Sequence, residues 1–440
     1  MGHNHPDQTA GPGRHHRAGV IARAIVLSTA SLSLSRAAAQ PCVSGWDSAF
    51  DPAPDGAVLA QTVIGAGAFA GLYTGGTFLT MGGAPATRIA KWDGAAWSPL
   101  GPGLNSAVNT LADFAGELHA GGSFSGDGVS LLSRVARWDG AAWRPLAGGL
   151  NADVLALAPA DLGAGMALYA AGSFTAADGL PAVGVARWDG VAWAPLGAGL
   201  QAGAKTGLAL AAHDDGSGVA LYIGGSFLGA GGQPSPNIAR WNGSAWLAAG
   251  AGLDAPVRAL AEFSGALIAG GDFLASGPTP AAHLARWDGA GWTEFAGGAN
   301  GPVHALLPLS LKTGPALVAA GEFTRIGAVE ADRIAIFNGS SWAPLDAGAA
   351  SIVCALARWG DNLSVGAHAT TPGGAAAPAL RRWILCDAGV LGDFNGDGVV
   401  DGVDLAFLLS QFGGSGSADL NGDGVVDGVD LAIVLSNFGP

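Results

Sequence analysis

A repeat of about fifty residues runs through most of this 440-residue chain and limits what the chain can fold into. Its clearest copy reads ARWDGAAWRPLAGGLNADVLALA, from Ala136 to Ala158. Two aromatic residues five positions apart mark the repeat: Trp92/Trp97, Trp138/Trp143, Trp188/Trp193, Trp241/Trp246, Trp287/Trp292 and Phe337/Trp342. Successive pairs are 46, 50, 53, 46 and 50 residues apart, and a Gly-rich stretch ending in Phe precedes each pair. A fixed period in this range is typical of a solenoid or a propeller.

The pattern inside one unit favours the propeller. Four short apolar stretches alternate with turn signals, and in the second unit they cover residues 108–114, 117–124, 134–138 and 143–146. Asp139-Gly140, a tight-turn dipeptide, joins the third stretch to the fourth. Four strands per unit is the blade pattern of a propeller. The 74 glycines also disfavour long helices, because each Gly in a helix interior costs about 1 kcal/mol.

The two ends of the repeat region predict how the circle closes. After Trp342, further apolar stretches cover residues 352–357, 362–368 and 379–383. Trp383 lies 46 residues after Phe337 and begins a seventh pair whose second Trp is missing, and Trp46 supplies it. We therefore predict an all-β, seven-bladed β-propeller over residues 40–386, closed by N-terminal strand exchange. Closure of this kind removes most exposed sheet edges.

The chain has only three cysteines. Cys42 and Cys386 occupy facing positions in the seventh hairpin, where a disulfide is sterically sensible and suits an exported protein. Cys354 lies inside a predicted strand, and we expect it to be a buried apolar residue without a disulfide partner.

Residues 1–39 have the features of an export signal peptide, with Arg14 and Arg17 before a mostly apolar stretch and cleavage expected near Ala39. No later apolar run is long enough to span a membrane. The net charge of −14 argues against a nucleic-acid partner, because phosphates would be repelled. With 49% apolar and 12% charged residues, the chain does not have the composition of a disordered protein.

The repeat resembles kelch and galactose-oxidase-type propellers, whose second strands end in a Gly-Gly doublet. It is more similar to cell-surface repeats of bacteria and fungi that read GGxF and then IARWxGxxW, as in residues 224–227 and 238–246. This resemblance implies a fold, whereas propellers host many functions.

The sequence indicates no catalytic residues. A copper radical oxidase on this fold would need Tyr and His ligands near the axis, but Tyr73, Tyr169, Tyr222 and His119 share one repeat position, which is typical of packing. The other histidines after the signal segment, His213, His283, His304 and His368, show no metal-ligand spacing and no unique cluster.

The acidic residues of the repeats do not indicate catalysis either. The Trp-Asp-Gly segments lack the boxes of sialidases, and Asn replaces Asp in two of them, as happens at turns. We expect Asp214 and Asp215 to lie solvated in a loop. A hydrolase that needs two carboxylates brought together in space stays open, because sequence cannot show their separation.

The strongest motif lies at the C-terminus, where DFNGDGVVDGVD at residues 393–404 recurs as DLNGDGVVDGVD at residues 419–430. The spacing places oxygen ligands at loop positions 1, 3, 5, 7, 9 and 12, which predicts two calcium ions. The predicted ligands, with the backbone carbonyl at position 7, are Asp393, Asn395, Asp397, Val399, Asp401 and Asp404, and Asp419, Asn421, Asp423, Val425, Asp427 and Asp430.

Residues 387–440 resemble type I dockerins, which are duplicated EF-hand-like loop–helix units. The segment before the first loop is not helical and position 12 is Asp, as in that family, and helices are expected over residues 405–412 and 431–438. The resemblance implies calcium-dependent protein–protein interaction with a cohesin-like or other cell-surface partner. Hydroxyl residues at loop positions 10 and 11 contact cohesin in cellulosomal dockerins, but Gly402-Val403 and Gly428-Val429 stand there in this chain.

These features favour a secreted or cell-surface, non-enzymatic binding or scaffold protein. Its propeller would present an interaction or carbohydrate-binding face, and its dockerin-like module would attach it to a partner. Two alternatives stay open: a polysaccharide-active enzyme, hydrolase or lyase, carried by the same module, and a structural component of the cell envelope.

Overall fold

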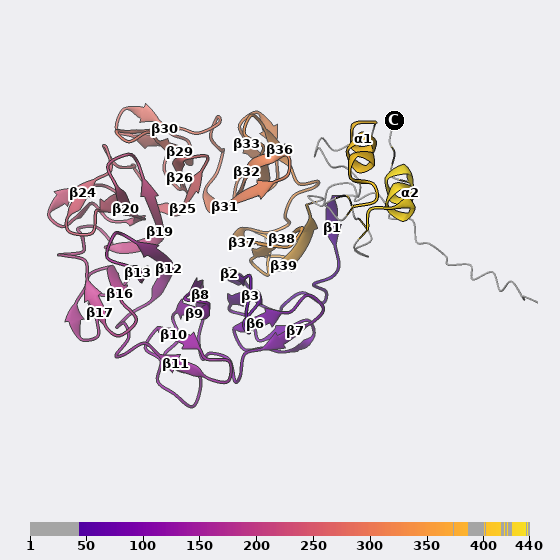
Figure 1. The fold of residues 1–440 in the computed structure, drawn as a ribbon. Coiled ribbons are helices and arrows are strands. Elements are labelled where there is room, and N and C mark those ends of the chain that lie inside the picture. The colour runs from indigo at the N-terminus through magenta and orange to yellow at the C-terminus, as the bar shows by residue number, and fades with distance from the viewer. Residues whose placement is uncertain are drawn as a thin grey trace, which may run out of the picture. The chain divides into compact units, whose positions relative to one another are not determined.

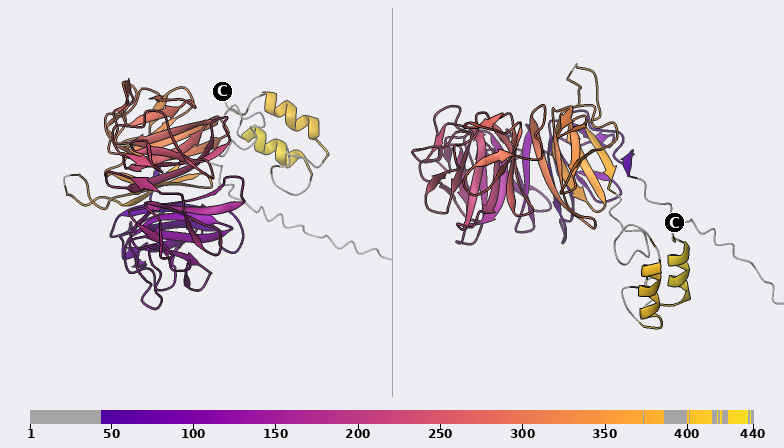
Figure 2. Two further views of the ribbon diagram at one scale, coloured as in Figure 1. Left: turned by 90° about the vertical axis from the view of Figure 1, so that its left-hand side faces the viewer. Right: turned by 90° about the horizontal axis from the view of Figure 1, so that it is seen from above.

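The computed structural model describes residues 44–372, 374–385, 400, 402–414, 418, 420, 425–436 and 438. Residues 44–372 and 374–385 form an all-β, propeller-like fold in which seven four-stranded sheets stand around a common centre (Figure 1). Figure 2 shows the sheets from two further sides, packed face to face. In the described ranges the chain has two short helices, and neither is long and apolar enough to cross a membrane. The predicted signal segment, residues 1–39, lies outside these ranges.

We number the sheets 1 to 7 by their first strands, which lie nearest the centre. These are β2 (Val58–Ile64), β8 (Val108–Phe114), β12 (Val154–Asp161), β19 (Thr206–Asp214), β25 (Val257–Phe263), β31 (Val303–Leu311) and β37 (Val353–Trp359). The second strands are β3 (Gly71–Gly76), β9 (Glu117–Gly122), β13 (Met166–Gly172), β20 (Val219–Ser226), β26 (Ala266–Gly271), β32 (Gly314–Gly321) and β38 (Asn362–Ala367).

The third strands carry the first aromatic residue of each pair at or near their ends. They are β6 (Ile89–Trp92), β10 (Val135–Trp138), β16 (Val185–Trp188), β23 (Ile238–Trp241), β29 (Leu284–Trp287), β35 (Ile334–Phe337) and β39 (Leu380–Ile384). The fourth strands are β7 (Trp97–Pro99), β11 (Trp143–Pro145), β17 (Trp193–Pro195), β24 (Trp246–Ala248), β30 (Trp292–Glu294), β36 (Trp342–Pro344) and, in sheet 7, β1 (Gly45–Asp47).

The four strands of sheet 2 agree with the sequence prediction to within about three residues at each end. The sequence did not predict the small hairpins that follow the second strands in five sheets. They are β4 (Thr80–Met81) with β5 (Ala84–Pro85), β14 (Ala176–Ala177) with β15 (Leu180–Pro181), β21 (Gly229–Ala230) with β22 (Gln233–Pro234), β27 (Ala275–Ser276) with β28 (Thr279–Pro280), and β33 (Arg325–Ile326) with β34 (Val329–Glu330). A further short strand, β18 (Leu200–Gln201), pairs with β21.

The Gly doublet at the end of the second strand allows two close approaches, and Ala320 in sheet 6 and Ala367 in sheet 7 each replace one of its glycines. A Cβ at Gly121 would lie 2.6 Å from Val154 Cγ1 in the next sheet, and a Cβ at Gly122 would lie 2.1 Å from the carbonyl of Ala107. Sheet 3 has Ala171 at the first of these positions, and the facing residue in sheet 4 is Gly207 instead of Val. The doublet therefore sets how closely neighbouring sheets pack.

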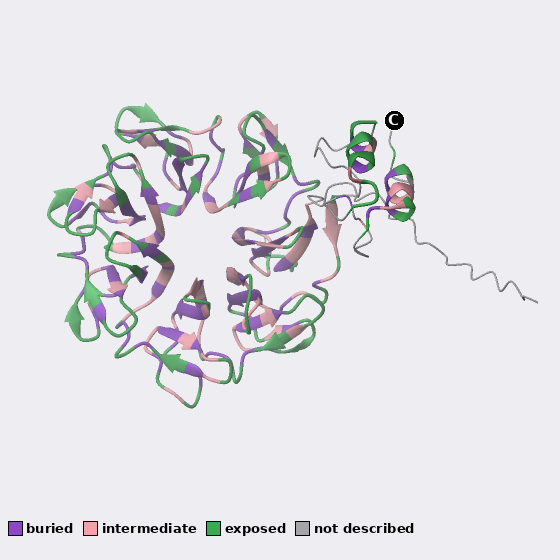
Figure 3. Cartoon of the chain, in the orientation of Figure 1, coloured by how far each residue is buried: buried purple, intermediate pink, exposed green. Residues whose placement is uncertain are grey.

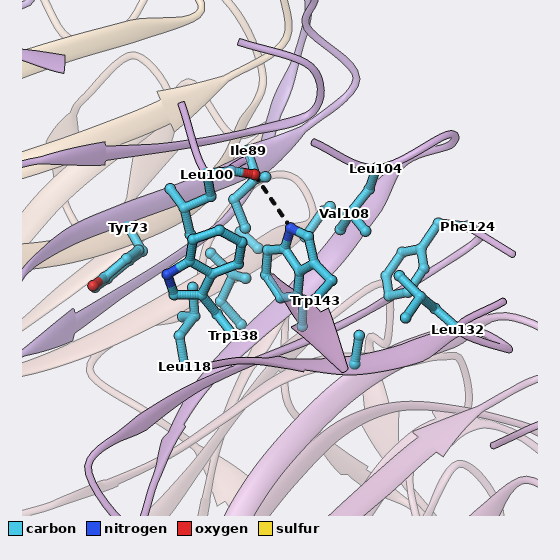
Figure 4. Packing of buried hydrophobic residues seen from close by; sticks show 14 of the residues in the cluster. Tyr73, Ile89, Leu100, Leu104, Val108, Leu118, Phe124, Leu132, Trp138 and Trp143 are labelled. Carbon is cyan, nitrogen blue, oxygen red and sulfur yellow. Dashed lines mark hydrogen bonds between the residues drawn. The ribbon is translucent and has the colours of Figure 1, made fainter. Parts of the chain in front are cut away.

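The second Trp of each aromatic pair links its sheet to the preceding one. Trp143 is fully buried, and its indole Nε1 donates a hydrogen bond to the carbonyl of Leu100 (3.4 Å), just after the fourth strand of sheet 1 (Figure 4). The same bond recurs at four further sheet boundaries: Trp193 to Leu146, Trp246 to Leu196, Trp292 to Ala249 and Trp342 to Ala296. Figure 3 shows the buried middle strands and the exposed ends of the fourth strands.

Sheet 7 includes the N-terminal strand β1, and its boundaries with sheets 6 and 1 differ from the others. Strand β1 pairs with β39 so that Trp46 lies opposite Trp383, and Asp47 forms a bidentate ion pair with Arg382. Gln61 Nε2 of sheet 1 donates a hydrogen bond to Ser364 Oγ of sheet 7 (2.5 Å). The indole nitrogens of Trp46 and Trp97 are buried without a hydrogen-bond partner. The indole–carbonyl bond is thus missing at two boundaries: between sheets 7 and 1, where Trp97 would make it, and between sheets 6 and 7, where Trp46 would make it.

The C-terminal segment contains α1 (Gly402–Gln411) and α2 (Gly428–Ser436). Its small core consists of Val400, Leu408, Ala418, Val426 and Val434. The N–H of Gly413 donates a hydrogen bond to the carbonyl of Val426, and the N–H of Val426 donates one to the carbonyl of Gly414, each at 2.8 Å. Val400 and Phe438 form an isolated parallel bridge. The two loop–helix units therefore pack as a pair.

The indole–carbonyl bond predicts a difference between two identical substitutions. We expect Trp193→Phe to lower the free energy of unfolding by about 1–3 kcal/mol more than Trp97→Phe, because only the former leaves a buried carbonyl unpaired. Both changes remove the same atoms, and because Trp97 is less buried than Trp193, only a difference larger than the loss of packing is assigned to the bond. Denaturant unfolding of the two variants measures the difference, and equal losses would contradict a stabilising role for the bond.

Candidate functional site

The structure describes four of the twelve predicted calcium ligands, and it places two of them at equivalent buried positions. Asp404 and Asp430 stand at position 12 of their loops and are both 0% exposed. Val425 and Asp427 are described as well, whereas Asp393, Asn395, Asp397, Val399, Asp401, Asp419, Asn421 and Asp423 lie outside the described residues. Cys42 and Cys386 also lie outside them, so the predicted disulfide stays a prediction.

The carboxylate of Asp430 organises the second loop. Its Oδ1 accepts a hydrogen bond from the backbone N–H of Leu420 (2.7 Å), and its Oδ2 accepts one from Asp427 (2.8 Å). Asp427 Oδ1 in turn accepts the N–H of Val429 (2.7 Å). A hard cation such as calcium prefers an all-oxygen ligand set, and the residue types at the six positions provide one. The buried acids at position 12 fit such a site. A buried carboxylate needs a positive charge beside it, and a bound cation would supply that charge.

The two helices begin three residues earlier than the sequence prediction. They start at Gly402 and Gly428, loop position 10, rather than at Leu405 and Leu431. The first helical turn therefore includes Asp404 or Asp430, and an acid there is favoured by the positive end of the helix dipole. The residues at loop position 11, Val403 and Val429, are exposed.

The aromatic position near the Gly doublet is confirmed as a packing site. Tyr73, His119, Tyr169 and Tyr222 are all buried, and each stands opposite a Lys or Arg of the third strand. Tyr73 OH donates a hydrogen bond to the carbonyl of Phe69 (2.6 Å), and burial raises the pKa of this phenol to about 12. Burial also lowers the pKa of His119.

The acids of the Trp-Asp-Gly segments cap turns, as the sequence indicates. Asp139 Oδ1 accepts the N–H groups of Ala141 and Ala142, and these bonds hold the pKa of Asp139 well below its usual range. Equivalent bonds recur at Asp93, Asp189, Asn242, Asp288 and Asn338.

The prediction that Asp215 is solvated is wrong. The Asp215 side chain is 4% exposed and forms an ion pair with Arg240. It also accepts hydrogen bonds from Tyr222 OH (2.9 Å) and Trp287 Nε1 (3.1 Å). The sequence could not show that Arg240, Tyr222 and Trp287 meet at this carboxylate. Their hydrogen bonds offset the free-energy cost of removing the carboxylate from water.

A cavity of about 240 Å³ lies where the first strands of all seven sheets meet. Each first strand has a β-bulge at its second or third residue, directly after Val or, in sheet 4, Gly207. A bulge re-aims a side chain and is common next to functional sites. The bulged residues are Leu59, Asn109, Leu155, Leu208, Arg258, His304 and Cys354. Six of the seven line the cavity, all but His304.

The residue after the Gly doublet, or after its equivalent, lies beside the bulged residue of the same sheet. In sheet 2, Asn109 Nδ2 lies 3.4 Å from Ser123 Oγ. In sheet 5, Arg258 makes a bidentate pair with Asp272 (2.6 and 2.8 Å). In sheet 6, His304 Nε2 lies 3.3 Å from Glu322 Oε1, without hydrogen-bond geometry.

Sheets 5, 6 and 7 thus carry a group of polar residues, of which Arg258 and Cys354 line the cavity. The axial cluster consists of Arg258, Asp272, His304, Glu322, Cys354 and His368. This corrects the expectation that no unique histidine or acid cluster exists. Within the described ranges no three His, Cys, Asp or Glu side chains are arranged to hold a metal ion.

The sequence did contain a signal for this cluster. The residue after the doublet is Thr77, Ser123, Ser173 or Ser226 in sheets 1 to 4, but Asp272, Glu322 and His368 in sheets 5 to 7. The bulged position changes from Leu or Asn to Arg, His and Cys in the same three sheets. An alignment of the repeats would therefore have shown that the bulged position and the position after the doublet both change in sheets 5 to 7.

The environment sets the protonation of the cluster. Burial lowers the pKa of His304 and Arg258 lowers it further, so the imidazole is neutral at pH 7. Burial raises the pKa of the Cys354 thiol to about 11. The hydrogen bonds that Arg258 donates to Asp272 raise the pKa of Arg258 and keep the guanidinium charged. Cys354 is therefore a protonated thiol in the wall of the cavity, and not the core residue that the sequence predicts.

Comparison with known proteins identifies the C-terminal segment. Residues 391–438 match the family model of the Dockerin type I domain, a family whose members bind calcium. No curated protein sequence matches the chain. Among solved structures, the chain is similar to the WD40 beta propeller domain of Doa1, with 14% identity and a TM-score of 0.49, over 78% of this chain and 97% of that one. It is also similar to the computationally designed protein Ika8, with 15% identity and a TM-score of 0.45, over 77% of this chain and 100% of that one.

The raised pKa of Cys354 predicts slow alkylation. At pH 8 a thiol of pKa about 11 has a thiolate fraction of about 10⁻³, against about 0.2 for a cysteine of ordinary pKa about 8.5, so iodoacetamide should label Cys354 at least about 100-fold more slowly than an unstructured cysteine peptide. The rate should rise about tenfold per pH unit between pH 7 and pH 9. Peptide mapping by mass spectrometry measures the labelling, and a rate that levels off near pH 8.5 would contradict the shift.

Proposed function

We propose that this chain is a secreted, non-enzymatic binding or scaffold protein: a seven-bladed propeller that binds a ligand, attached to a partner by a calcium-dependent dockerin module. The observation that carries the proposal is the dockerin match over residues 391–438, because a dockerin serves to attach the protein that bears it to a cohesin. The propeller is then the part that is delivered. Closure by exchange of the N-terminal strand is supported by the β1–β39 pairing.

The attachment would use two calcium ions, one in each loop. The equivalent burial of Asp404 and Asp430 supports two equivalent sites. The exposed Val403 and Val429 lie where cellulosomal dockerins have hydroxyl groups, which favours a cohesin-like partner with an apolar contact surface.

The propeller would bind its ligand on the face that carries the small hairpins. The first strands begin at this face and the second strands end there, because Val108 pairs with Gly122 and Phe114 with Glu117 at the opposite end. The axial cluster therefore opens toward the same face. Exposed apolar side chains also lie on its loops, among them Leu79, Leu228 and Leu274.

One observation supports the alternative that the propeller is a hydrolase or lyase carried by the dockerin module. A neutral His304 beside the half-exposed Glu322 resembles the pairing of a base with its orienting acid. Non-enzymatic binding is preferred because the remaining acids and tyrosines of the repeats are engaged in turns and packing.

Calcium should control the C-terminal module alone. We expect Asp397→Ala together with Asp423→Ala to abolish capture of the full chain by an immobilised type I cohesin and to make residues 387–440 sensitive to protease. Each change removes a predicted ligand, and in such small modules the metal-binding free energy is folding free energy. The propeller should resist the protease, since no propeller residue is a predicted ligand.

The unsubstituted chain in calcium and in excess chelator supplies the positive and negative controls. Capture that persists in chelator would contradict calcium-dependent attachment.

The absence of catalysis is tested by a panel of polysaccharides, sugar alcohols and glycosides incubated with the purified chain. We expect no turnover above that of a His304→Ala, Glu322→Ala double variant. Turnover that this double variant lacks would establish the enzyme alternative.

A further inference from the structure

We propose that Asn242 and Asn338 are sites of N-linked glycosylation, at which the side-chain amide nitrogen carries an oligosaccharide in the exported chain. The two residues stand in the turns between the third and fourth strands of sheets 4 and 6. This inference goes beyond the proposed function and rests on one part of it, secretion, because this modification belongs to secreted proteins.

The first argument is that two positions of this turn change together. N-linked glycosylation requires Asn followed two residues later by Ser or Thr. Sheets 4 and 6 read Asn-Gly-Ser at residues 242–244 and 338–340, whereas the turns of sheets 1, 2, 3 and 5 read Asp-Gly-Ala or Asp-Gly-Val. Asn and Asp interchange at turns, but the turn does not require the hydroxyl, because the Asp turns form with Ala or Val in its place. The paired change therefore indicates a glycosylation sequence.

The second argument is the direction of the amide group. Asn242 Oδ1 accepts the backbone N–H groups of the residues two and three positions later, at 3.0 and 2.8 Å. Asn338 Oδ1 accepts the equivalent N–H groups at 3.0 and 2.9 Å. Only the oxygen of an amide can accept these bonds, so the nitrogen Nδ2 lies on the other branch of the side chain, where an Asp has its second oxygen.

The surroundings leave this nitrogen available. In sheet 2 the second oxygen, Asp139 Oδ2, accepts a hydrogen bond from Arg144 (2.6 Å). The residues at the position of Arg144 in sheets 4 and 6 have no polar side-chain atom, and they are Leu247 and Ala343. Within the described ranges, Nδ2 of neither asparagine has a hydrogen-bond partner. A glycan on Nδ2 would therefore cost the turn none of its hydrogen bonds.

The third argument is the position of the two turns. Residues 242–245 and 338–341 are exposed. Trp241, directly before the first turn, pairs with Leu221 near the start of β20, whereas the small hairpins follow the ends of the second strands. The turns thus lie at the end of the sheets opposite the hairpins. A bulky, solubilising glycan there would leave the proposed ligand-binding face free.

A third Asn-x-Ser sequence, Asn362-Leu363-Ser364, has a different environment. Asn362 is half-buried, and its Nδ2 donates a hydrogen bond to the carbonyl of Trp359 (3.4 Å). Ser364 is 1% exposed and accepts the hydrogen bond from Gln61 of sheet 1. A glycan on Asn362 would break the first bond and displace buried neighbours, so we expect the folded chain to carry none at this site.

The transfer requires a donor, an oligosaccharide linked to a polyprenyl diphosphate, which the exporting cell supplies. The bond that forms joins Nδ2 to the anomeric carbon of the first sugar, and the bond that breaks joins that carbon to the phosphate oxygen. The polyprenyl diphosphate leaves with the electron pair of the broken bond, and the proton lost from Nδ2 passes to a base of the transferring enzyme. No oxidant or reductant is needed.

The first measurement is peptide mapping, by mass spectrometry, of the chain purified from the cells that export it. An amidase that releases N-linked glycans in heavy-oxygen water converts each glycosylated Asn to a labelled Asp. A parallel incubation without the amidase accounts for spontaneous deamidation of the Asn-Gly sequences. We expect amidase-dependent label at Asn242 and Asn338 and none at Asn362.

Matched variants test which residues define the site, in a host cell that N-glycosylates the proteins it secretes. The host's own signal peptide replaces residues 1–39, so the test does not depend on the predicted signal. Ser340→Ala removes the required hydroxyl and should abolish the glycan at Asn338. Ser341→Ala makes the same change at the next residue of the turn and should leave that glycan in place. Sheets 1 and 2 have Ala at both positions, so both variants should fold.

Several outcomes would overturn the inference. These are an unmodified Asn242 or Asn338 in the exported chain, a glycan that remains in Ser340→Ala, and a glycan lost in Ser341→Ala. The same peptide maps show whether residues 1–39 have been removed. A chain that is cleaved near Ala39 but lacks glycans contradicts the glycosylation sites alone. A chain that keeps residues 1–39 and stays inside the cell contradicts the proposed secretion, so the two failures are distinguishable.

Discussion

The hydrogen bond from a buried indole N–H to a carbonyl of the preceding sheet holds the propeller-like fold together. In the repeated aromatic pairs the two residues face each other across a tight turn, as Trp138 and Trp143 do, and in five of these pairs the second one bonds across the sheet boundary. The spacing of five residues follows from that turn. Each bond satisfies two buried polar groups, which would each be costly if left unpaired. At the boundary of sheets 7 and 1 this bond is missing, and a hydrogen bond from Gln61 to Ser364 joins the two sheets. The Asp47–Arg382 ion pair and the Arg381 guanidinium over the Trp46 ring, 4.1 Å from its centroid, hold β1 to β39 within sheet 7.

In a repeat of this kind, the positions that pack neighbouring sheets together are different from the position that is free to vary. The Gly doublet, the Val before the bulge and the indole make close contacts in most sheets, whereas six of the seven bulged residues line a cavity. Leu155 and Arg258 occupy equivalent positions in identical backbone surroundings. A ring of seven such positions can therefore carry a binding site on one arc without loss of stability elsewhere. Function in such a fold is best sought where equivalent positions differ.

These contacts explain what the sequence could and could not predict. The strands of sheet 2 and the role of Asp139 were predictable, because they depend on local alternation and turn chemistry. The bulge was not, since an extra residue shifts the alternation by one and only the pairing of Val108 with Gly122 reveals it. The Arg258–Asp272 pair joins residues 14 apart, and the cluster joins sheets about fifty residues apart. The burial of Asp215 depends on Trp287, which is 72 residues away. Eight of the twelve predicted calcium ligands lie outside the described residues, so their prediction rests on spacing alone.

The start of the C-terminal helices inside the loops connects metal binding to docking. Because α1 begins at loop position 10, Val403 belongs both to the first helical turn and to the predicted ligand loop, and Val429 does the same in α2. Asp430 already gathers the N–H groups of Leu420 and Asp427 around its carboxylate. A cation that binds this carboxylate would fix the loop and the helix start together. The exposed valines would then hold one position relative to each other only when both loops are filled. Helices of nine and ten residues are marginal alone in water, so the surface that a partner recognises would depend on the metal.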